Sequence, residues 1–194
     1  MERKAFKKLI EWKGDPDRKP LILKGARQVG KTWLMKEFGS TQYTDYVYCN
    51  FDEEDELKSI FDKNKNPQRI IELLGLLHGR KIMPAETLII FDEIQECSEA
   101  LNALKYFREK ANGYHVVAAG SLLGTLLAKP ESFPVGQVNL VDIYPLQFDE
   151  FLAAIDDALY LYYMQIEKGQ RIEEVFHARL IDAYNYYLII GGLP

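Results

Sequence analysis

The sequence predicts an α/β protein built on a parallel sheet with helices on both faces. Over the first 145 residues, short apolar runs alternate with amphipathic stretches, as strands and crossover helices do in such folds. The middle runs are apolar throughout, which is typical of strands buried on both faces. After Pro145 the chain holds amphipathic stretches and no further strand pattern. We therefore expect a three-layer α/β core over 1–145 and the start of a helical lid over 146–194.

The elements follow from these patterns in chain order. The expected strands are 20–25, 46–51, 87–92, 115–120 and 138–144. The expected core helices are an amphipathic segment within the first twelve residues and 31–38, 55–63, 67–78, 98–111 and 121–128. In the first helix, the residues spaced to face the core are Phe6, Leu9, Ile10 and Trp12. The lid contributes helices within 146–155 and 171–190.

Composition excludes several classes of protein. The chain is 47% hydrophobic and 27% charged, as ordinary globular proteins are. No apolar run approaches the roughly 20 residues that span a bilayer, so no membrane association is expected. The N-terminus carries basic residues without the apolar segment of a secretory signal. Cys49 and Cys97 do not suggest a disulfide framework, which favours a reducing, cytoplasmic location.

Charge is distributed unevenly along the chain. Residues 1–36 hold eleven Lys and Arg against four Asp and Glu, whereas the whole chain has a net charge of −5. A basic N-terminal segment favours a polyanionic ligand, from ATP up to nucleic acid, although a solvated helix face beside a phosphate loop gives the same balance. The acidic total argues against broad nonspecific binding of DNA by this segment alone.

A glycine-bearing turn joins the first expected strand to the helix that follows it. Gly25, Gly30, Lys31 and Thr32 form the spacing G-x-x-x-x-G-K-T, which is typical of a loop that binds nucleotide phosphates. The glycines let backbone N–H groups approach phosphate oxygens, and the helix start adds a positive dipole end. The sequence therefore predicts a phosphate-binding loop.

The residues of this loop have distinct expected roles. Lys31 is expected to act on the β- and γ-phosphates in binding and catalysis, and Thr32 to give its hydroxyl to Mg²⁺. Arg27 is either a further cation near phosphate or a solvent-facing side chain. The expected nucleotide contacts are Gly25, Ala26, Arg27, Gln28, Val29, Gly30, Lys31, Thr32 and Trp33. The guanine-reading pattern N-K-x-D is absent from the sequence, which favours ATP over GTP.

A second motif, TLIIFDE at 87–93, ends an expected buried strand with two carboxylates. Ligands of open α/β sheets bind beyond the carboxyl ends of the strands, where both side chains would lie. Asp92 is expected to hold Mg²⁺, through a water. Glu93 is expected to polarise the water that attacks the γ-phosphate, as a general base. The predicted cofactors are therefore ATP and Mg²⁺.

Ser121 follows a third buried strand in VVAAGS. At this position it is either a catalytic contact near the γ-phosphate or the N-cap of the next helix, and the two roles are compatible. The three histidines, by contrast, share no metal-ligand spacing with either cysteine.

Six segments of the chain together carry a resemblance to a known family. They are ARQVGKTWLMKEF, LIIFDEIQ, YHVVAAGSLLG, FPVGQV, YPLQFDEFL and GGLP. In this order the chain resembles the N-terminal domain of the bacterial and archaeal AAA-type ATPases with an R-Q-V-G-K-T loop, within the AAA+ P-loop ATPases. The resemblance covers nearly the whole chain. It implies a five-stranded parallel sheet of order 5-1-4-3-2, Glu93 as catalytic glutamate and Ser121 at a sensor position.

The resemblance also concerns the end of the chain. In related ATPases the G-G-x-P turn approaches the adenine, which makes Gly191, Gly192 and Pro194 expected base contacts. Family members continue into a helical and winged region and a nuclease-like domain, so we expect a longer protein whose later parts cover the apolar end of this one. A homo-oligomer remains open, as does a DNA or protein client reached through those parts.

One departure from the family concerns the arginine finger, which acts on a neighbour's γ-phosphate. Residues 121–141 hold no arginine, and Gln137 stands where family members more often have one. Three alternatives follow. The finger lies elsewhere, at Arg80 or Arg108, or it is missing from this segment, or hydrolysis by this protein is slow. The leading interpretation is a Mg²⁺-dependent ATPase that drives a conformational switch in a multidomain protein. The alternative is an ATP-dependent scaffold that hydrolyses slowly or not at all.

Overall fold

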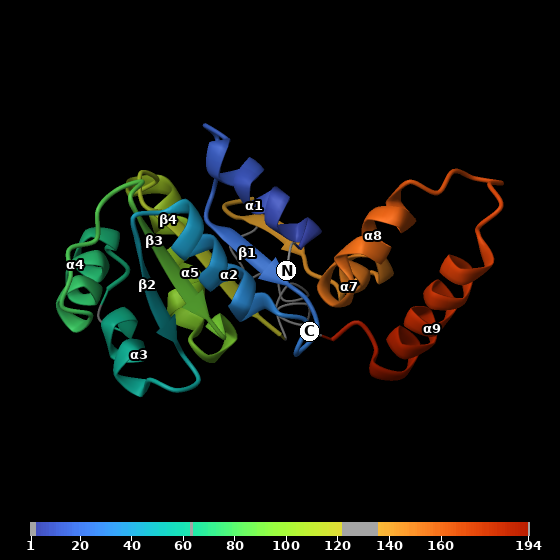
Figure 1. Ribbon diagram of the computed structural model, residues 1–194. Helices are drawn as coiled ribbons and strands as arrows, with labels where there is room; N and C mark the ends of the chain where they lie inside the picture. The colour runs from blue at the N-terminus through green and yellow to red at the C-terminus, as the bar shows by residue number, and fades with distance from the viewer. Residues whose placement is uncertain (1–2, 63, 122–135, 194) are drawn as a thin grey trace.

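A computed structural model describes residues 3–62, 64–121 and 136–193 (Figure 1). Five strands form one parallel sheet in the order β2-β3-β4-β1-β5. They are β1 (Leu21–Lys24), β2 (Asp45–Asn50), β3 (Thr87–Asp92), β4 (His115–Gly120) and β5 (Asn139–Asp142). Read from the other edge this is 5-1-4-3-2, so the expected strand order is confirmed.

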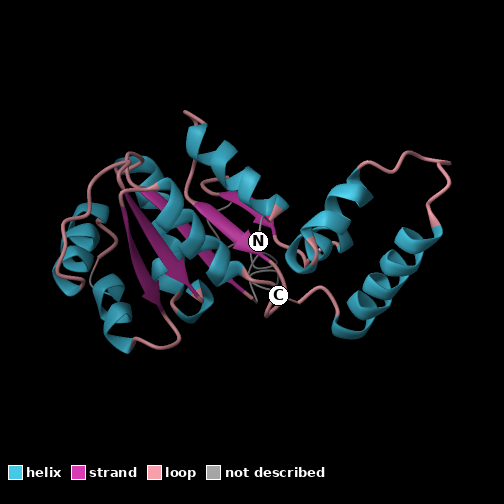
Figure 2. Cartoon of the chain, in the orientation of Figure 1, coloured by secondary structure: helices cyan, strands magenta, loops and turns pink. Residues whose placement is uncertain are grey.

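Helices cover both faces of the sheet (Figure 2). The core helices are α1 (Lys4–Gly14), α2 (Lys31–Gln42), α3 (Asp55–Asp62), α4 (Pro67–Leu77) and α5 (Ser98–Lys110), with a short 3-10 helix, η1 (Ile94–Glu96). Alternate strand residues separate the two faces: Leu88 and Ile90 pack with α1 and α2, whereas Ile89 and Phe91 pack with α3, α4 and α5. The sheet is therefore buried on both sides, as its apolar strands predict.

The observed element bounds differ little from the expected ones. The strands 87–92 and 115–120 are confirmed to the residue, and the other strands and core helices shift by a few residues at their ends. Apart from Ser121, the expected helix at 121–128 falls on residues outside the described ones. Ile10 is 44% exposed, so its expected burial is wrong, while Leu9 and Trp12 carry the contact of α1 with the core.

Three helices follow the sheet: α7 (Phe148–Ile155), α8 (Asp157–Met164) and α9 (Glu174–Ile190). They lie beyond the β5 edge, away from α3 and α4 (Figure 1). Their own small core consists of Leu152, Leu159, Leu180 and Ala183. The sequence pattern predicted α7 and α9 but missed α8, because its run of alanine, leucine and tyrosine shows no clear apolar face. None of the helices within the described residues is long and apolar enough to cross a membrane.

A buried ion pair joins the extension to the core. Arg3 and Glu150 are 4% and 6% exposed, with Nε and Oε1 3.4 Å apart. The same carboxylate accepts the backbone N–H groups of Lys4 and Gln147, each at 2.8 Å. The start of α1 and the start of α7 are thereby held on one side chain.

A second polar contact is buried beneath α1. The hydroxyl of Tyr43 lies 2.7 Å from Nδ1 of His115 at the start of β4, and the ring of Trp12 packs edge-on at 5.8 Å. Burial lowers the pKa of His115 to about 4, and the positive charges of Arg18 and Lys13 add to this. His115 is therefore neutral in the folded chain near neutral pH.

The stability of the fold should depend on this histidine at acidic pH. Between pH 6.5 and about 4 the unfolded chain takes up a proton at His115 that the folded chain does not. The free energy of unfolding therefore decreases as the pH is lowered through this range. The loss is at most about 3 kcal/mol. Urea unfolding at several pH values should show a shallower dependence in His115→Gln than in wild type. His177→Gln, which changes an exposed histidine on α9, is the control and should match wild type. An unchanged slope in His115→Gln would contradict the assignment.

Candidate functional site

The turn between β1 and α2 has a backbone that depends on its glycines. Gly30 immediately precedes α2 with φ of +85°, in the left-handed region that favours glycine. A Cβ on Gly25 would collide with the carbonyl oxygen of Ile143, just after β5. Gln28 also has a positive φ, of +63°. The two glycines of the motif therefore serve a close approach and a left-handed turn.

Lys31 bends back over this turn. Its Nζ donates to the carbonyl oxygens of Gly25 and Ala26, at 3.0 and 2.7 Å, and the residue is 6% exposed. Burial lowers the pKa of Lys31, and the nearby carboxylates of Glu93 and Asp92 oppose that shift. The loop thus carries a poorly solvated cation held on two neutral carbonyl groups, an arrangement that an incoming anion would stabilise.

Thr32 connects the turn to the end of β3. Its hydroxyl donates to Oδ2 of Asp92 at 2.6 Å. Asp92 is 2% exposed, and its other oxygen, Oδ1, accepts the backbone N–H of Glu93 at 3.0 Å. The structure therefore brings together the two residues that the sequence predicts as metal ligands. Hydroxyl and carboxylate oxygens are the donors that Mg²⁺ prefers, usually together with water and substrate phosphates.

Glu93 follows in a left-handed conformation, with φ of +47°. Its Oε2 accepts the side-chain amide of Gln95 at 2.6 Å, and the same amide lies 3.3 Å from Oε1 of Glu96. The sequence reasoning missed Gln95, although its position two residues after Glu93 puts it within reach of that carboxylate.

Tyr48 on β2 is a second residue that the sequence reasoning missed. Its hydroxyl donates to Oδ2 of Asp92 at 3.0 Å. Burial raises the pKa of Tyr48 well above its usual value, and the charge of Asp92 adds to this, so the phenol remains a donor. The strand order places β2 beside β3, which is the information needed to find this contact.

Ser121 lies at the end of β4, where its hydroxyl is 3.5 Å from Nε of Arg27. Arg27 itself is exposed. The helix that would test the N-cap role of Ser121 falls outside the described residues.

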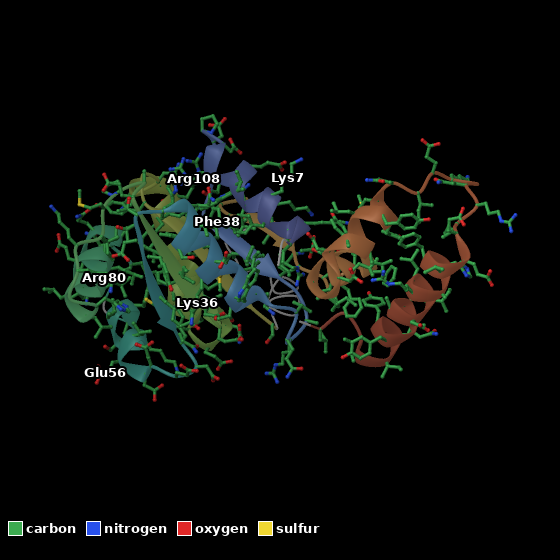
Figure 3. All side chains as sticks on the ribbon, viewed as in Figure 1. Lys7, Lys36, Phe38, Glu56, Arg80 and Arg108 are labelled. Atoms are coloured by element: carbon green, nitrogen blue, oxygen red, sulfur yellow. The ribbon has the colours of Figure 1, made fainter. Side chains whose placement is uncertain are left out.

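Neither of the alternative finger arginines lies at this end of the sheet. Arg80 forms an ion pair with Asp45 at the opposite edge, where β2 begins. Arg108 is in the last turn of α5, close to the start of β4, and Figure 3 shows both side chains away from Lys36.

A pocket of about 1220 Å³ opens above the turn. The predicted site residues that line it are Arg27, Gln28, Gly30, Lys31, Thr32, Trp33 and Glu93. Those that do not line it are Gly25, Ala26, Val29, Asp92 and Ser121. Arg3 also lines the pocket and donates to the carbonyl oxygen of Val29 at 3.2 Å, a contact that the sequence reasoning missed.

The expected base contacts at the end of the chain are Gly191, Gly192 and Pro194. Pro194 lies outside the described residues. The carbonyl oxygen of Gly192 accepts the backbone N–H of Leu146 at 2.6 Å, so this turn packs on the link between β5 and α7. Neither Gly191 nor Gly192 is among the described residues that line the pocket.

Comparisons with known proteins agree with this arrangement. A model of the AAA domain family matches residues 17–152, which include the turn, both carboxylates and Ser121. A Walker-type ATPase of Pyrococcus abyssi has a similar fold, with a TM-score of 0.59 and 17% identity over 100% of this chain and 64% of that one. No curated protein matches the chain significantly.

Two further solved structures match with lower TM-scores. C. elegans PCH-2 gives 0.47 at 11% identity, over 93% of this chain and 56% of its own. AMPPCP-bound DnaA from Aquifex aeolicus gives 0.45 at 15% identity, over 98% of this chain and 61% of its own. The chain therefore spans less than two thirds of the length of all three proteins. Since the family model covers well over half of the chain, the chain belongs to the AAA domain family of P-loop ATPases.

Proposed function

We propose that the chain binds ATP together with Mg²⁺, hydrolyses it, and transmits the nucleotide state to the helices α7–α9. The observation that carries this proposal is the hydrogen bond of 2.6 Å between Thr32 and Asp92. It joins the two motifs, which are 60 residues apart, beside a pocket that Thr32 lines. A hydroxyl and a carboxylate in contact near a buried lysine are suited to binding a phosphate together with its metal ion.

Nucleotide binding would use hydrogen-bond donors that the turn already provides. Lys31 would exchange the carbonyl groups of Gly25 and Ala26 for charged phosphate oxygens, a stronger contact because both partners carry charge. The N-terminus of α2 and the turn's N–H groups favour the same anion. Thr32 and Asp92 would hold Mg²⁺, which when bound neutralises phosphate charge.

Hydrolysis would depend on Glu93, which lines the pocket one residue after the metal-binding carboxylate. As general base it would accept a proton from the attacking water. Its hydrogen bond to the amide of Gln95 fixes the direction of the carboxylate.

The same bond favours the second candidate function, a scaffold that binds ATP and hydrolyses it slowly. A carboxylate that accepts an amide hydrogen at 2.6 Å has one oxygen less available for a water molecule. The absence of arginine from residues 121–141 points in the same direction. Turnover of the wild-type chain in its different assembly states separates the two candidates.

Coupling to the helical extension would pass through Arg3. Its guanidinium donates to the carbonyl oxygens of Val29 in the turn and of Tyr144 before α7, and it pairs with Glu150 of α7. A shift of the phosphate loop on binding nucleotide would therefore act directly on the start of the extension.

One prediction from the proposed function concerns nucleotide binding. Lys31→Ala should weaken affinity for ATP by roughly 10- to 100-fold, the range for a lost charge-assisted contact. Isothermal titration calorimetry measures this directly. Lys7→Ala is the control, because Lys7 is exposed on α1, is not among the described residues that line the pocket, and lies away from Lys36 in Figure 3. Equal affinities of Lys31→Ala and wild type would refute the assignment of the loop.

A further prediction separates binding from chemistry. Glu93→Gln should retain Mg-ATP binding and slow phosphate release by about 100-fold or more, the scale of a lost general base. Glu56→Gln, at an exposed position on α3, is the matched control and should turn over like wild type (Figure 3). Full turnover in Glu93→Gln would show that another group is the base. A wild-type chain that binds ATP without turnover in any assembly state would favour the scaffold.

A further inference from the structure

The carboxylate of Asp92 is held by donors from three different parts of the chain. Oδ2 accepts the hydroxyls of Thr32 and Tyr48, at 2.6 and 3.0 Å. Oδ1 accepts the backbone N–H of Glu93 at 3.0 Å. With 2% of Asp92 exposed, these donors replace the water that a carboxylate needs when it is buried.

Tyr48 reaches this carboxylate from the edge strand β2. Side chains alternate along the strand, so Val47 and Cys49 enter the core on the side of α3 and α5, while Tyr46 and Tyr48 pack on the side of α1 and α2. Tyr48 pairs in register with Ile90, two residues before Asp92 on β3. Neither Tyr48 nor Asp92 is among the described residues that line the pocket, so Tyr48 contacts Asp92 outside the pocket lining.

Lys36 of α2 packs over the ring of Tyr48. Its Nζ lies 3.6 Å from the ring centroid of Tyr48, within the range of a cation–π contact. Lys36 is one turn after Thr32 on α2. A continuous set of contacts therefore runs from Thr32 to Asp92, on to Tyr48, and back through Lys36 to the same helix.

We propose that Tyr48 is a positioning residue of the magnesium site and that its phenol orients the carboxylate of Asp92. In this orientation the hydroxyl of Thr32 would donate its hydrogen to Asp92 and keep its lone pairs for the metal. This inference rests on the proposed function. Tyr48 does not touch nucleotide or metal; it acts through Asp92.

The physical reason lies in how the carboxylate can turn. The N–H of Glu93 holds one oxygen, and among the described residues the hydroxyls of Thr32 and Tyr48 hold the other. Without the phenol, Thr32 alone would have to fix Oδ2 while binding the metal with the same hydroxyl group. Partners that orient metal ligands in this way contribute roughly 10- to 100-fold to metal affinity in proteins.

A purely structural role for the phenol is the competing explanation, and the geometry separates the two. Backbone pairing from Asp45 to Asn50 already holds β2 to β3 along the whole strand. Removing one hydroxyl oxygen while keeping the ring should leave that pairing and the contact with Lys36 in place. The loss should therefore appear in metal dependence and not in folding.

The test compares Tyr48→Phe with wild type by calorimetric titration of a non-hydrolysable ATP analogue, in excess EDTA and over a series of Mg²⁺ concentrations. We expect unchanged affinity in EDTA and a roughly tenfold rise in the Mg²⁺ concentration that gives half-maximal enhancement of binding. Tyr114→Phe, which removes a phenol beside the opposite end of β4, is the control and should match wild type.

Each other outcome overturns the proposal. An unchanged Mg²⁺ dependence in Tyr48→Phe would show that the phenol does not orient Asp92. An equal loss of affinity in EDTA and in Mg²⁺, together with a lower melting temperature, would assign Tyr48 a structural role only. A wild-type chain that binds nucleotide without any response to Mg²⁺ would remove the metal site itself. A wild-type chain that binds no nucleotide would refute the proposed function first, and the role of Tyr48 with it.

Discussion

The hydrogen bond between Thr32 and Asp92 is the contact on which the arrangement of the site depends. Thr32 lies in the first turn of α2, which follows β1. Asp92 ends β3, and β4 lies between β1 and β3 in the sheet. α2 connects β1 to β2 and packs over β4 and β3, which lie between them, so its first turn comes within reach of the end of β3. The order of the strands therefore determines the geometry of the site, and a change in strand order would separate the two motifs.

This arrangement places polar groups at the end of an apolar, buried strand. β3 is fully buried along its length, yet it ends in Asp92. A carboxylate there is tolerable because three donors satisfy it, and Lys31 is tolerable because carbonyl groups of the turn receive its hydrogens. The buried groups are thus satisfied in ways that a phosphate and a divalent cation would replace with stronger contacts.

The sequence was sufficient for those parts of the fold and site whose pattern is local. The spacing from Gly25 to Thr32 and the carboxylates after an apolar run are contiguous signals, and the resemblance supplied the strand order. Tyr48, Gln95 and Arg3 were missed for different reasons. Tyr48 and Arg3 act across 44 and 26 residues, distances that only strand register and helix docking define. Gln95 is local, but it became visible only through the left-handed turn at Glu93. Ile10 was misplaced because four apolar positions in one short helix do not say which of them lies at the margin of the contact.

The ion pair between Arg3 and Glu150 shows how the site and the extension are physically connected. A buried pair is weak evidence for stability, since desolvation of both charges offsets much of their attraction. What it does specify is geometry, because each group also binds backbone: Arg3 the carbonyl oxygens of Val29 and Tyr144, and Glu150 the N–H groups of Lys4 and Gln147. Moving α7 away from the core would break the ion pair and the hydrogen bond from the N–H of Lys4 to Glu150. Moving the carbonyl group of Val29 would act on the same arginine. The turn after β1 and the first helix of the extension therefore share one set of polar contacts, centred on Arg3.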